Sequence, residues 1–207
     1  KIYGQHWHIW EENGRLVFQD ENGLLDLPLP KLIGAHQIQN AGIALATLRY
    51  LGKENSSFEG AMLNADWPAR MQRLRKGILT SLAPSAEIWL DGGHNKAAGY
   101  ALTEAIGRLQ PRKLFLIVGM LNTKDIVGYM KPLLSRSTNL YGVSIPGEAA
   151  TMTAEETVKI ARDVGFEAVI SEDVESAIRD IIKQDDNARI LICGSLYLAG
   201  NILQKNS

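Results

Sequence analysis

After Arg70 the chain alternates short apolar runs with longer amphipathic segments, and this alternation constrains its fold more than any other feature. The runs are Ile88–Leu90, Leu114–Val118, Leu140–Ile145, Ala168–Ile170 and Ile190–Cys193. They lack strict alternation of polar and apolar residues, which favours strands buried on both faces of a parallel sheet. Residues 71–207 are therefore predicted to form an α/β domain, with a Rossmann-like, mostly parallel sheet and helices on both faces.

The segments between these runs have the spacing of amphipathic helices. Thr153 and Glu156 have the spacing of a capping box, which predicts a helix that begins just after Thr153. Three apolar stripes mark the helices: Ala98, Leu102, Ala105 and Leu109; Val158, Ala161 and Val164; and Val174, Ile178 and Ile181.

Residues 1–66 follow a different pattern. Asn-Gly pairs at 13–14 and 22–23 favour tight hairpin turns, which predicts an antiparallel β-meander. Helical spacing then runs from Ile38 to Leu48, and a second short helix is predicted over Phe58–Ala65. Pro68 interrupts the periodicity, so residues 67–70 are the predicted linker between two domains. The predicted strands of the meander are Ile2–Glu11, Arg15–Asp20 and Leu24–Leu29.

Composition excludes several classes of protein. The 207 residues carry 22 Lys and Arg against 23 Asp and Glu, so neither a basic nucleic-acid surface nor an acidic tail is expected. No apolar run is long enough to span a membrane, and we expect a cytoplasmic protein with no nucleic-acid or membrane partner. The single cysteine, Cys193, lies in an apolar run and is predicted to be a buried structural thiol.

Three of the predicted strands run directly into glycine-containing turns. Leu90 is followed by Asp91-Gly92-Gly93-His94-Asn95, Val118 by Gly119, and Cys193 by Gly194. Ligands of open α/β sheets bind beyond the carboxyl ends of the strands, so these turns are the predicted site. For Gly119 and Gly194 taken singly, a tight turn between strand and helix is the favoured explanation.

The turn after Leu90 is the most specific of the three, and two interpretations of it stay open. Asp91 can accept a ribose hydroxyl or orient a metal-bound water, and His94 can face a phosphate. In the alternative, Asp91 closes the turn and Asn95 caps the following helix, with no contact to a ligand.

Two further positions are weaker candidates. His36 and Asn40 are four residues apart on one helix face and can read a purine edge, although a simple helix start is favoured. Arg70 can pair with a phosphate, whereas an isolated linker arginine is more often solvated or in an ion pair. No cluster with the spacing of metal ligands is present, so no metal-binding residue is predicted in this chain.

Taken in order, five segments resemble the bifunctional folylpolyglutamate synthase/dihydrofolate synthase, a family within the wider Mur ligase group. The sequence departs from the usual pattern at four positions: Ala69 where Gly is common, Gly93 where Ala is frequent, Lys96 where Pro is common, and Thr123 where an acid is usual. The five segments are Leu32–Ala41, Trp67–Gln72, Leu90–Asn95, Gly119–Asp125 and Gly194–Gly200.

The resemblance implies an ATP-dependent ligase that phosphorylates a pteroate or folate carboxylate and joins it to the amine of L-glutamate. It places Asn40 near the adenine, and Arg70, Asp91 and His94 around the nucleotide, with Asp91 and His94 also in catalytic roles. It further implies ATP and Mg²⁺ as cofactors and dihydropteroate or folate as the substrate; we also expect a monomer.

The phosphate-binding loop of such ligases, Gly-x-x-x-x-Gly-Lys-Ser/Thr, is not found in this sequence. We therefore expect residues 1–66 to be the last part of a central ATP-binding domain, and most Mg²⁺ ligands to lie upstream. This portion alone is predicted to be inactive. The alternatives are another Mur-type ligase, for a cell-wall peptide or cyanophycin, and a Rossmann-like binding module without chemistry.

Overall fold

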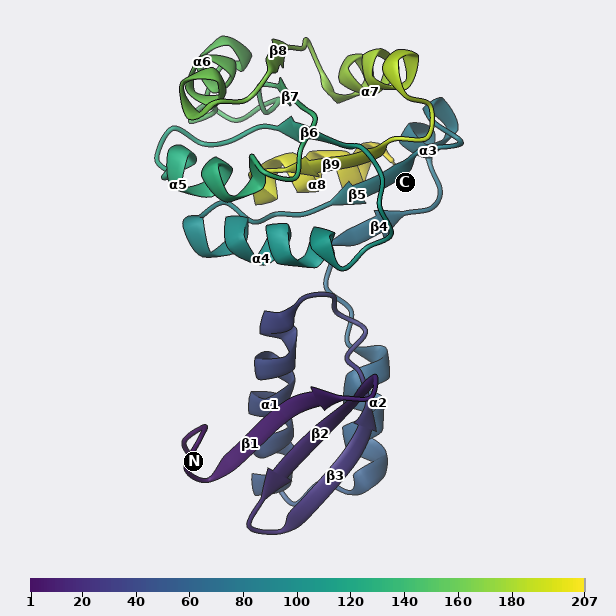
Figure 1. Ribbon diagram of the computed structural model, residues 1–207, viewed down its shortest axis with the longest axis vertical. Coiled ribbons are helices and arrows are strands. Elements are labelled where there is room, and N and C mark those ends of the chain that lie inside the picture. Colours follow the sequence, from purple (N-terminus) through teal and green to yellow (C-terminus); the bar gives the residue numbers. More distant parts are fainter. Residues whose placement is uncertain (207) are drawn as a thin grey trace. The chain divides into compact units, whose positions relative to one another are not determined.

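The structure is a computed structural model that describes residues 1–206, and it divides into two compact units between Trp67 and Pro68 (Figure 1). This boundary falls inside the segment predicted as a linker, residues 67–70. Each unit has its own hydrophobic core. In the part of the chain that the structure describes, no helix is long and apolar enough to cross a membrane.

The first unit contains the predicted antiparallel meander, with strand order β1-β2-β3. The first strand begins five residues later than predicted, because residues 3–6 form a turn in which the Gly4 amide donates to the Trp7 carbonyl at 2.9 Å. Positive φ angles at Asn13 and Gly14 explain the first hairpin turn. The strands are β1 (Trp7–Glu12), β2 (Arg15–Asp20) and β3 (Gly23–Pro28).

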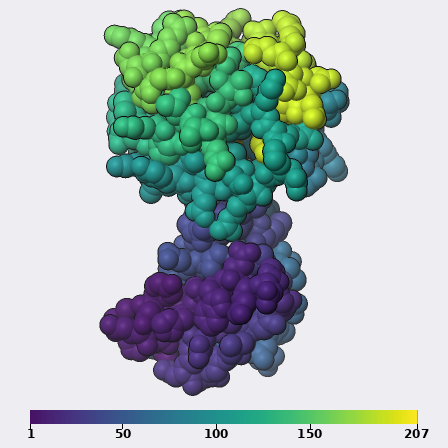
Figure 2. Space-filling view, in the orientation of Figure 1, coloured from purple at the N-terminus to yellow at the C-terminus, as the bar shows by residue number. Residues whose placement is uncertain are grey.

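Two helices, α1 (Ala35–Tyr50) and α2 (Asn55–Asn64), cover one face of this meander. The strand residues, purple in the space-filling view, form the face of the unit turned to the viewer (Figure 2). Between the layers lies an aromatic and aliphatic core that includes Phe18, Leu45 and Phe58. Arg49 lies at the border of this core: its guanidinium packs over the Phe18 ring and pairs with the buried Asp20 carboxylate.

The second unit is built on a six-stranded sheet in the order β4-β5-β9-β6-β7-β8. All neighbouring strands are parallel except β4, which pairs antiparallel with β5. The predicted mostly parallel sheet is therefore confirmed, while the short edge strand β4 was not predicted. The strands are β4 (Gln72–Leu74), β5 (Glu87–Leu90), β6 (Leu114–Val118), β7 (Asn139–Gly142), β8 (Ala168–Ile170) and β9 (Arg189–Cys193).

Helices cover both faces of this sheet, as predicted. Helices α3, α7 and α8 pack on one face through a core that includes Ile88, Ile178 and Ile202, and α4, α5 and α6 cover the other. The helices are α3 (Ile78–Leu82), α4 (Lys96–Gly107), α5 (Ile126–Met130), α6 (Ala154–Val164), α7 (Val174–Gln184) and α8 (Leu196–Lys205), with a 3₁₀ turn η1 (Lys131–Leu133) after α5.

Two details of the sequence prediction are wrong. Val169 and Ile170 are 41% and 48% exposed, because β8 is an edge strand and not one buried on both faces. The stripe on α4 is also shifted: Gly99 and Ile106 are buried in it, whereas Leu109 lies beyond the end of the helix. The capping box of Thr153 and Glu156 is confirmed, with both of its hydrogen bonds present.

Helix α4 begins at the turn that follows β5, so its first residues position that turn. Asn95 is the N-cap, and its side-chain oxygen accepts from the Ala98 amide at 2.9 Å. Lys96 follows as the first helical residue, where a positive charge opposes the helix dipole and proline is favoured. Lysine at this position is thus a local disadvantage for the helix.

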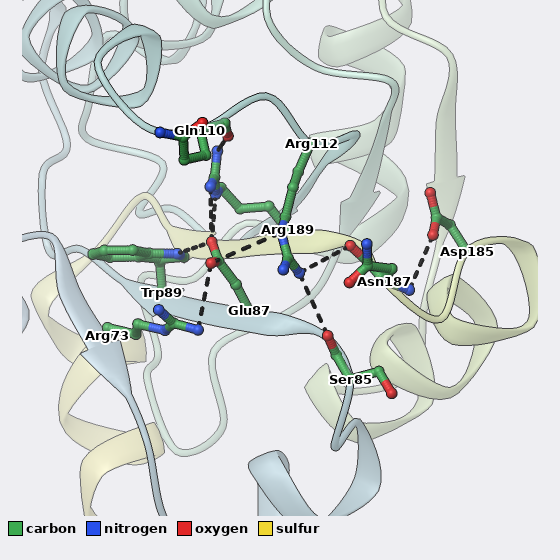
Figure 3. Close-up of polar contacts among 9 residues, drawn as sticks. All are labelled: Arg73, Ser85, Glu87, Trp89, Gln110, Arg112, Asp185, Asn187 and Arg189. Carbon is green, nitrogen blue, oxygen red and sulfur yellow. Dashed lines mark hydrogen bonds and ion pairs between the residues drawn. The ribbon is translucent and has the colours of Figure 1, made fainter.

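At the amino ends of the parallel strands, the Glu87 carboxylate lies close to three arginine side chains (Figure 3). Glu87, at the start of β5, accepts a hydrogen bond of 2.8 Å from Nε of the buried Arg189 of β9 and one of 3.3 Å from the Trp89 indole. Nη2 of Arg189 lies 2.8 Å from the same carboxylate oxygen as an ion pair. Arg73 and Arg112 lie 3.4 and 3.8 Å from its other oxygen. Glu87 thereby ties together the starts of β5 and β9 and the edge strand β4.

Burial alone would raise the pKa of Glu87. The hydrogen bonds from Arg189 and Trp89, together with the charges of Arg189 and Arg73, outweigh that effect and lower the pKa below its usual value of 4.5. A depressed folded-state pKa stabilises the fold above the usual pKa, and this stabilisation is lost as the pH falls through the folded-state value.

We predict that Glu87→Gln lowers the free energy of unfolding by about 2–3 kcal/mol at pH 7, because it leaves the Arg189 guanidinium buried without a counter-charge. Urea unfolding from pH 7 down to pH 3 measures this, and the gap to the parent protein should shrink below pH 4.5. Glu104→Gln is the control, because its pair with Arg108 is half exposed and should matter by less than about 0.5 kcal/mol. Equal losses in the two variants, or a gap that does not change with pH, would contradict the prediction.

We also predict that Lys96→Pro stabilises the second unit by about 0.5–1 kcal/mol, because proline fits the first turn and restricts the unfolded chain. Asn95 already has the extended backbone that a following proline requires, with φ −139° and ψ 168°. Lys96→Ala separates the effect of the lost charge from that of the ring. A loss of stability in the proline variant, measured by thermal unfolding, would contradict the prediction.

Candidate functional site

Asp91 stands at the carboxyl end of β5 and is only 3% exposed. One of its carboxylate oxygens accepts from the Gly93 amide at 2.7 Å, and the other accepts from the Met71 amide at 2.8 Å. The Gly92 amide in turn donates to the Ala69 carbonyl at 2.8 Å. Asp91 therefore closes its own turn, as one of the two sequence interpretations predicts, and it also binds the segment that enters the unit.

That entering segment has an unusual backbone. Ala69 and Met71 have φ angles of 56° and 41°, in the left-handed region that disfavours residues with a side chain. Glycine reaches this region freely, whereas Ala69 and Met71 adopt it only because other contacts hold them there. The Asp91 bonds hold this strained segment in place, and the sequence alone gave no sign that the Met71 amide takes part.

Arg70 lies between these two anchored residues and is exposed. Its guanidinium forms no ion pair with the residues described in the second unit. The backbone on both sides of Arg70 is anchored, while its side chain is exposed.

His94 is the third predicted residue on this turn. Its Nδ1 lies 3.0 Å from the Gly92 carbonyl oxygen. A carbonyl can only accept, so Nδ1 carries the proton, and Nε2 is left as an acceptor in the neutral ring or as a donor in the imidazolium. The structure therefore gathers Arg70, Asp91 and His94 around a single turn at the carboxyl edge of the sheet.

The turns after β6 and β9 lie against one another. A Cβ on Gly194, whose φ is 105°, would lie 2.9 Å from the Gly119 carbonyl oxygen, so both the backbone angle and the contact require glycine. A Cβ on Gly92 would lie 2.3 Å from the Leu196 side chain at the start of α8. The three glycine turns thus lie side by side at the carboxyl ends of the strands. The backbone of Gly194 is that of a tight turn between strand and helix.

Tyr129 of α5 and Cys193 of β9 are both buried beneath this edge. Burial raises the pKa of Cys193 to about 12, which confirms the predicted structural thiol. Burial also raises the pKa of Tyr129 well above its usual range, and the nearby Asp91 carboxylate adds to this effect. Both groups stay protonated at neutral pH, and sequence reasoning missed Tyr129 because it lies inside an otherwise apolar helix.

The remaining predicted residue, Asn40, belongs to the first unit. Its side-chain amide donates to Gln37 at 3.0 Å, and Gln37 lies 2.9 Å from His36 Nε2. Gln37 is buried, whereas Asn40 is exposed at the start of α1. His36 and Asn40 are therefore linked through Gln37, which the sequence argument did not single out.

Residues 1–206 contain few clustered side chains of the kinds that bind metal ions. That part of the chain holds no group of three or more His, Cys, Asp or Glu side chains placed to bind a metal ion. The described residues therefore do not by themselves fit a divalent cation.

Comparisons with known proteins find similar synthases. The folylpolyglutamate synthase of Lacticaseibacillus casei is 26% identical over 210 residues, covering 95% of this chain and 44% of that protein. The structure of E. coli FolC has a TM-score of 0.80 and 25% identity, covering 98% of this chain and 46% of that one. The bifunctional synthase of Yersinia pestis, also 25% identical, has a TM-score of 0.79 and the same coverage.

The chain thus spans slightly less than half the length of these relatives. Within it, the family described as the C-terminal domain of dihydrofolate synthetase matches residues 78–205, which include the Asp91 turn and all of α4 to α8. That match covers more than half of the chain. It includes the three glycine turns and all strands of the sheet except β4, which lies just before it. The chain therefore belongs to the family of dihydrofolate synthetase C-terminal domains.

Proposed function

We propose that this chain acts as the C-terminal part of an ATP-dependent ligase that adds L-glutamate to dihydropteroate or folate. The observation that carries the proposal is the Asp91 turn, which gathers Arg70 and His94 at the carboxyl edge of the sheet in a domain of this family. The E. coli relative was solved in complex with DHPP and ADP, which supports a nucleotide in the reaction.

The reaction proceeds in two steps. A carboxylate of the pterin substrate attacks the γ-phosphorus of ATP and gives an acyl phosphate and ADP. The amine of glutamate then attacks the acyl carbon and releases phosphate. Both steps bring anions together, so catalysis depends on placed positive charge and on alignment.

Each residue of the turn has a distinct proposed role. The free guanidinium of Arg70 pairs with a phosphate of the nucleotide, for which its planar fork is suited. His94 presents Nε2 to the same region, because its Nδ1 proton is held by the Gly92 carbonyl. Asp91 acts chiefly by holding both residues in place, since its two oxygens already accept backbone amides. Asn40 is the proposed contact to adenine.

A divalent cation is part of the proposal as well, and we propose Mg²⁺. The Yersinia pestis relative was solved with AMPPNP and a Mn ion. When bound, such a cation neutralises phosphate charge during transfer. Both oxygens of Asp91 already accept backbone amides, so we propose that the cation takes its ligands from other residues of the enzyme.

The activity is tested with the polypeptide translated from the complete reading frame that contains this chain. We expect labelled glutamate to be incorporated into dihydropteroate or folate only when ATP and Mg²⁺ are present. A cell-wall acceptor, such as a UDP-linked muramoyl peptide, should give no product, and the 207-residue chain alone should show no turnover. Incorporation into the cell-wall acceptor alone, or no incorporation by the complete polypeptide, would overturn the proposal.

Arg70→Ala should lower kcat/KM of that polypeptide by about 10- to 100-fold, the size of a lost charge-assisted hydrogen bond. The melting temperature should change by less than about 2 °C, because the guanidinium forms no ion pair in its unit. Arg75→Ala is the matched control, since Arg75 is an exposed arginine five residues further on. If Arg70→Ala chiefly unfolds the protein, or if both variants lose activity equally, the proposed phosphate contact is wrong.

A further inference from the structure

The second unit contains an open pocket of about 600 Å³ at the edge of the sheet opposite the Asp91 turn. Its wall includes the loop that leads into β6, the segment that leads into β7, and the first residue of β9. These strands run parallel to β5, so their starts lie at the amino edge, whereas Asp91 follows the carboxyl end of β5. The pocket is therefore separate from the site proposed above.

Four cations line this pocket and no acidic residue does: Arg112, Lys113, Arg136 and Arg189. Glu87 lies beside it and pairs most closely with Arg189, but the same carboxylate also faces Arg73 and Arg112. Lys113 has only a 3.9 Å contact with Asp185. The positive charge around the pocket is thus only partly neutralised.

Arg136 is the member of this group whose charge is least neutralised by nearby carboxylates. Within the described part of the second unit, no carboxylate lies within ion-pair distance of its guanidinium. The guanidinium lies over the end of α4, where a Cβ on Gly107 would be 2.9 Å from Nη2. A cation placed beside a concave surface with no counter-charge favours the binding of an anion.

Backbone carbonyls hold two of the arginines that line the pocket (Figure 3). Arg112 Nη1 donates to the carbonyls of Ser85 and Asn187 at 3.4 and 3.2 Å, and Arg189 Nη1 donates to that of Gln110 at 2.9 Å. These bonds fix the charges before a ligand arrives, which reduces the entropy lost on binding.

Hydroxyl groups complete the wall. Ser135, Ser137 and Thr138 all line the pocket. The Ser137 Oγ is buried and has no hydrogen-bond partner among the residues that the structure describes, which is uncommon for a buried hydroxyl. No aromatic side chain lines the pocket, so nothing there is suited to stack on a nucleobase.

We propose that this pocket is a second binding site that takes a small phosphate-bearing anion. Guanidinium, ammonium and hydroxyl donors are the groups that bind phosphate oxygens, and the volume suits a small ligand. The absence of an aromatic platform favours a phosphorylated compound without a base over a nucleotide. The inference stands on the pocket alone and does not depend on the proposed ligase reaction.

The test is a titration of the ¹⁵N-labelled 207-residue chain with inorganic pyrophosphate at physiological salt, followed by amide chemical shifts. We expect saturable shifts at residues 107–113 and 135–138. Arg136→Ala should raise the Kd about tenfold, the value of one charge-assisted hydrogen bond. Because Arg136 is exposed, this variant should fold, which its unchanged spectrum elsewhere verifies.

Lys159→Ala serves as the control, because it removes an exposed charge of the same unit that does not line the pocket. It should change the Kd less than twofold. Citrate, which carries carboxylates in place of phosphates, should bind at least tenfold more weakly than pyrophosphate. Shifts confined to residues 91–98, no saturation, equal effects of the two variants, or citrate binding as tight as that of pyrophosphate would each overturn the proposal.

Discussion

The Asp91 carboxylate is the contact on which the candidate site depends. It is buried, and its two oxygens accept from two amides that are far apart in the chain, those of Met71 and Gly93. A buried carboxylate is stable only when it is paired or hydrogen-bonded, so these two bonds are a condition for the fold as well as for the site. The Met71 bond and the bond from the Gly92 amide to the Ala69 carbonyl also anchor two residues in the left-handed region, which neither favours by itself. Arg70 lies between these two anchored residues, and its side chain is therefore exposed to solvent.

The carboxyl and amino ends of the parallel strands differ in the charged groups that they carry. At the carboxyl edge the neutral Tyr129 and Cys193 lie beneath Asp91, and the cation of the turn is exposed to solvent. At the amino edge Glu87 faces three arginines, and further cations border an open pocket. The same parallel sheet therefore presents one edge suited to aligning substrates and another that carries excess positive charge.

Much of this fold follows from pattern, because buried parallel strands need continuous apolar runs and capped helices leave a clear signature. For that reason the runs at Leu114–Val118 and Ile190–Cys193 predicted strands, and Thr153 predicted a helix start. Strand β4 was not, because its three residues gain their structure from pairing with β5 and not from their own sequence. The exposure of β8 depends on its place at the edge of the sheet, which no local pattern encodes.

For the site, sequence located the turn but not the bonds that shape it. Asp91, His94 and Asn95 are adjacent in the chain, so their common turn was predictable, whereas the bond to the Met71 amide joins residues far apart. The central claim is that this bond holds the entering segment. Amide hydrogen exchange measures it directly: Met71 and Gly93 should be protected, and Asp91→Asn should speed the exchange of both while β6 stays protected. Unprotected Met71 and Gly93 amides in the parent protein, within an otherwise protected sheet, would contradict the account.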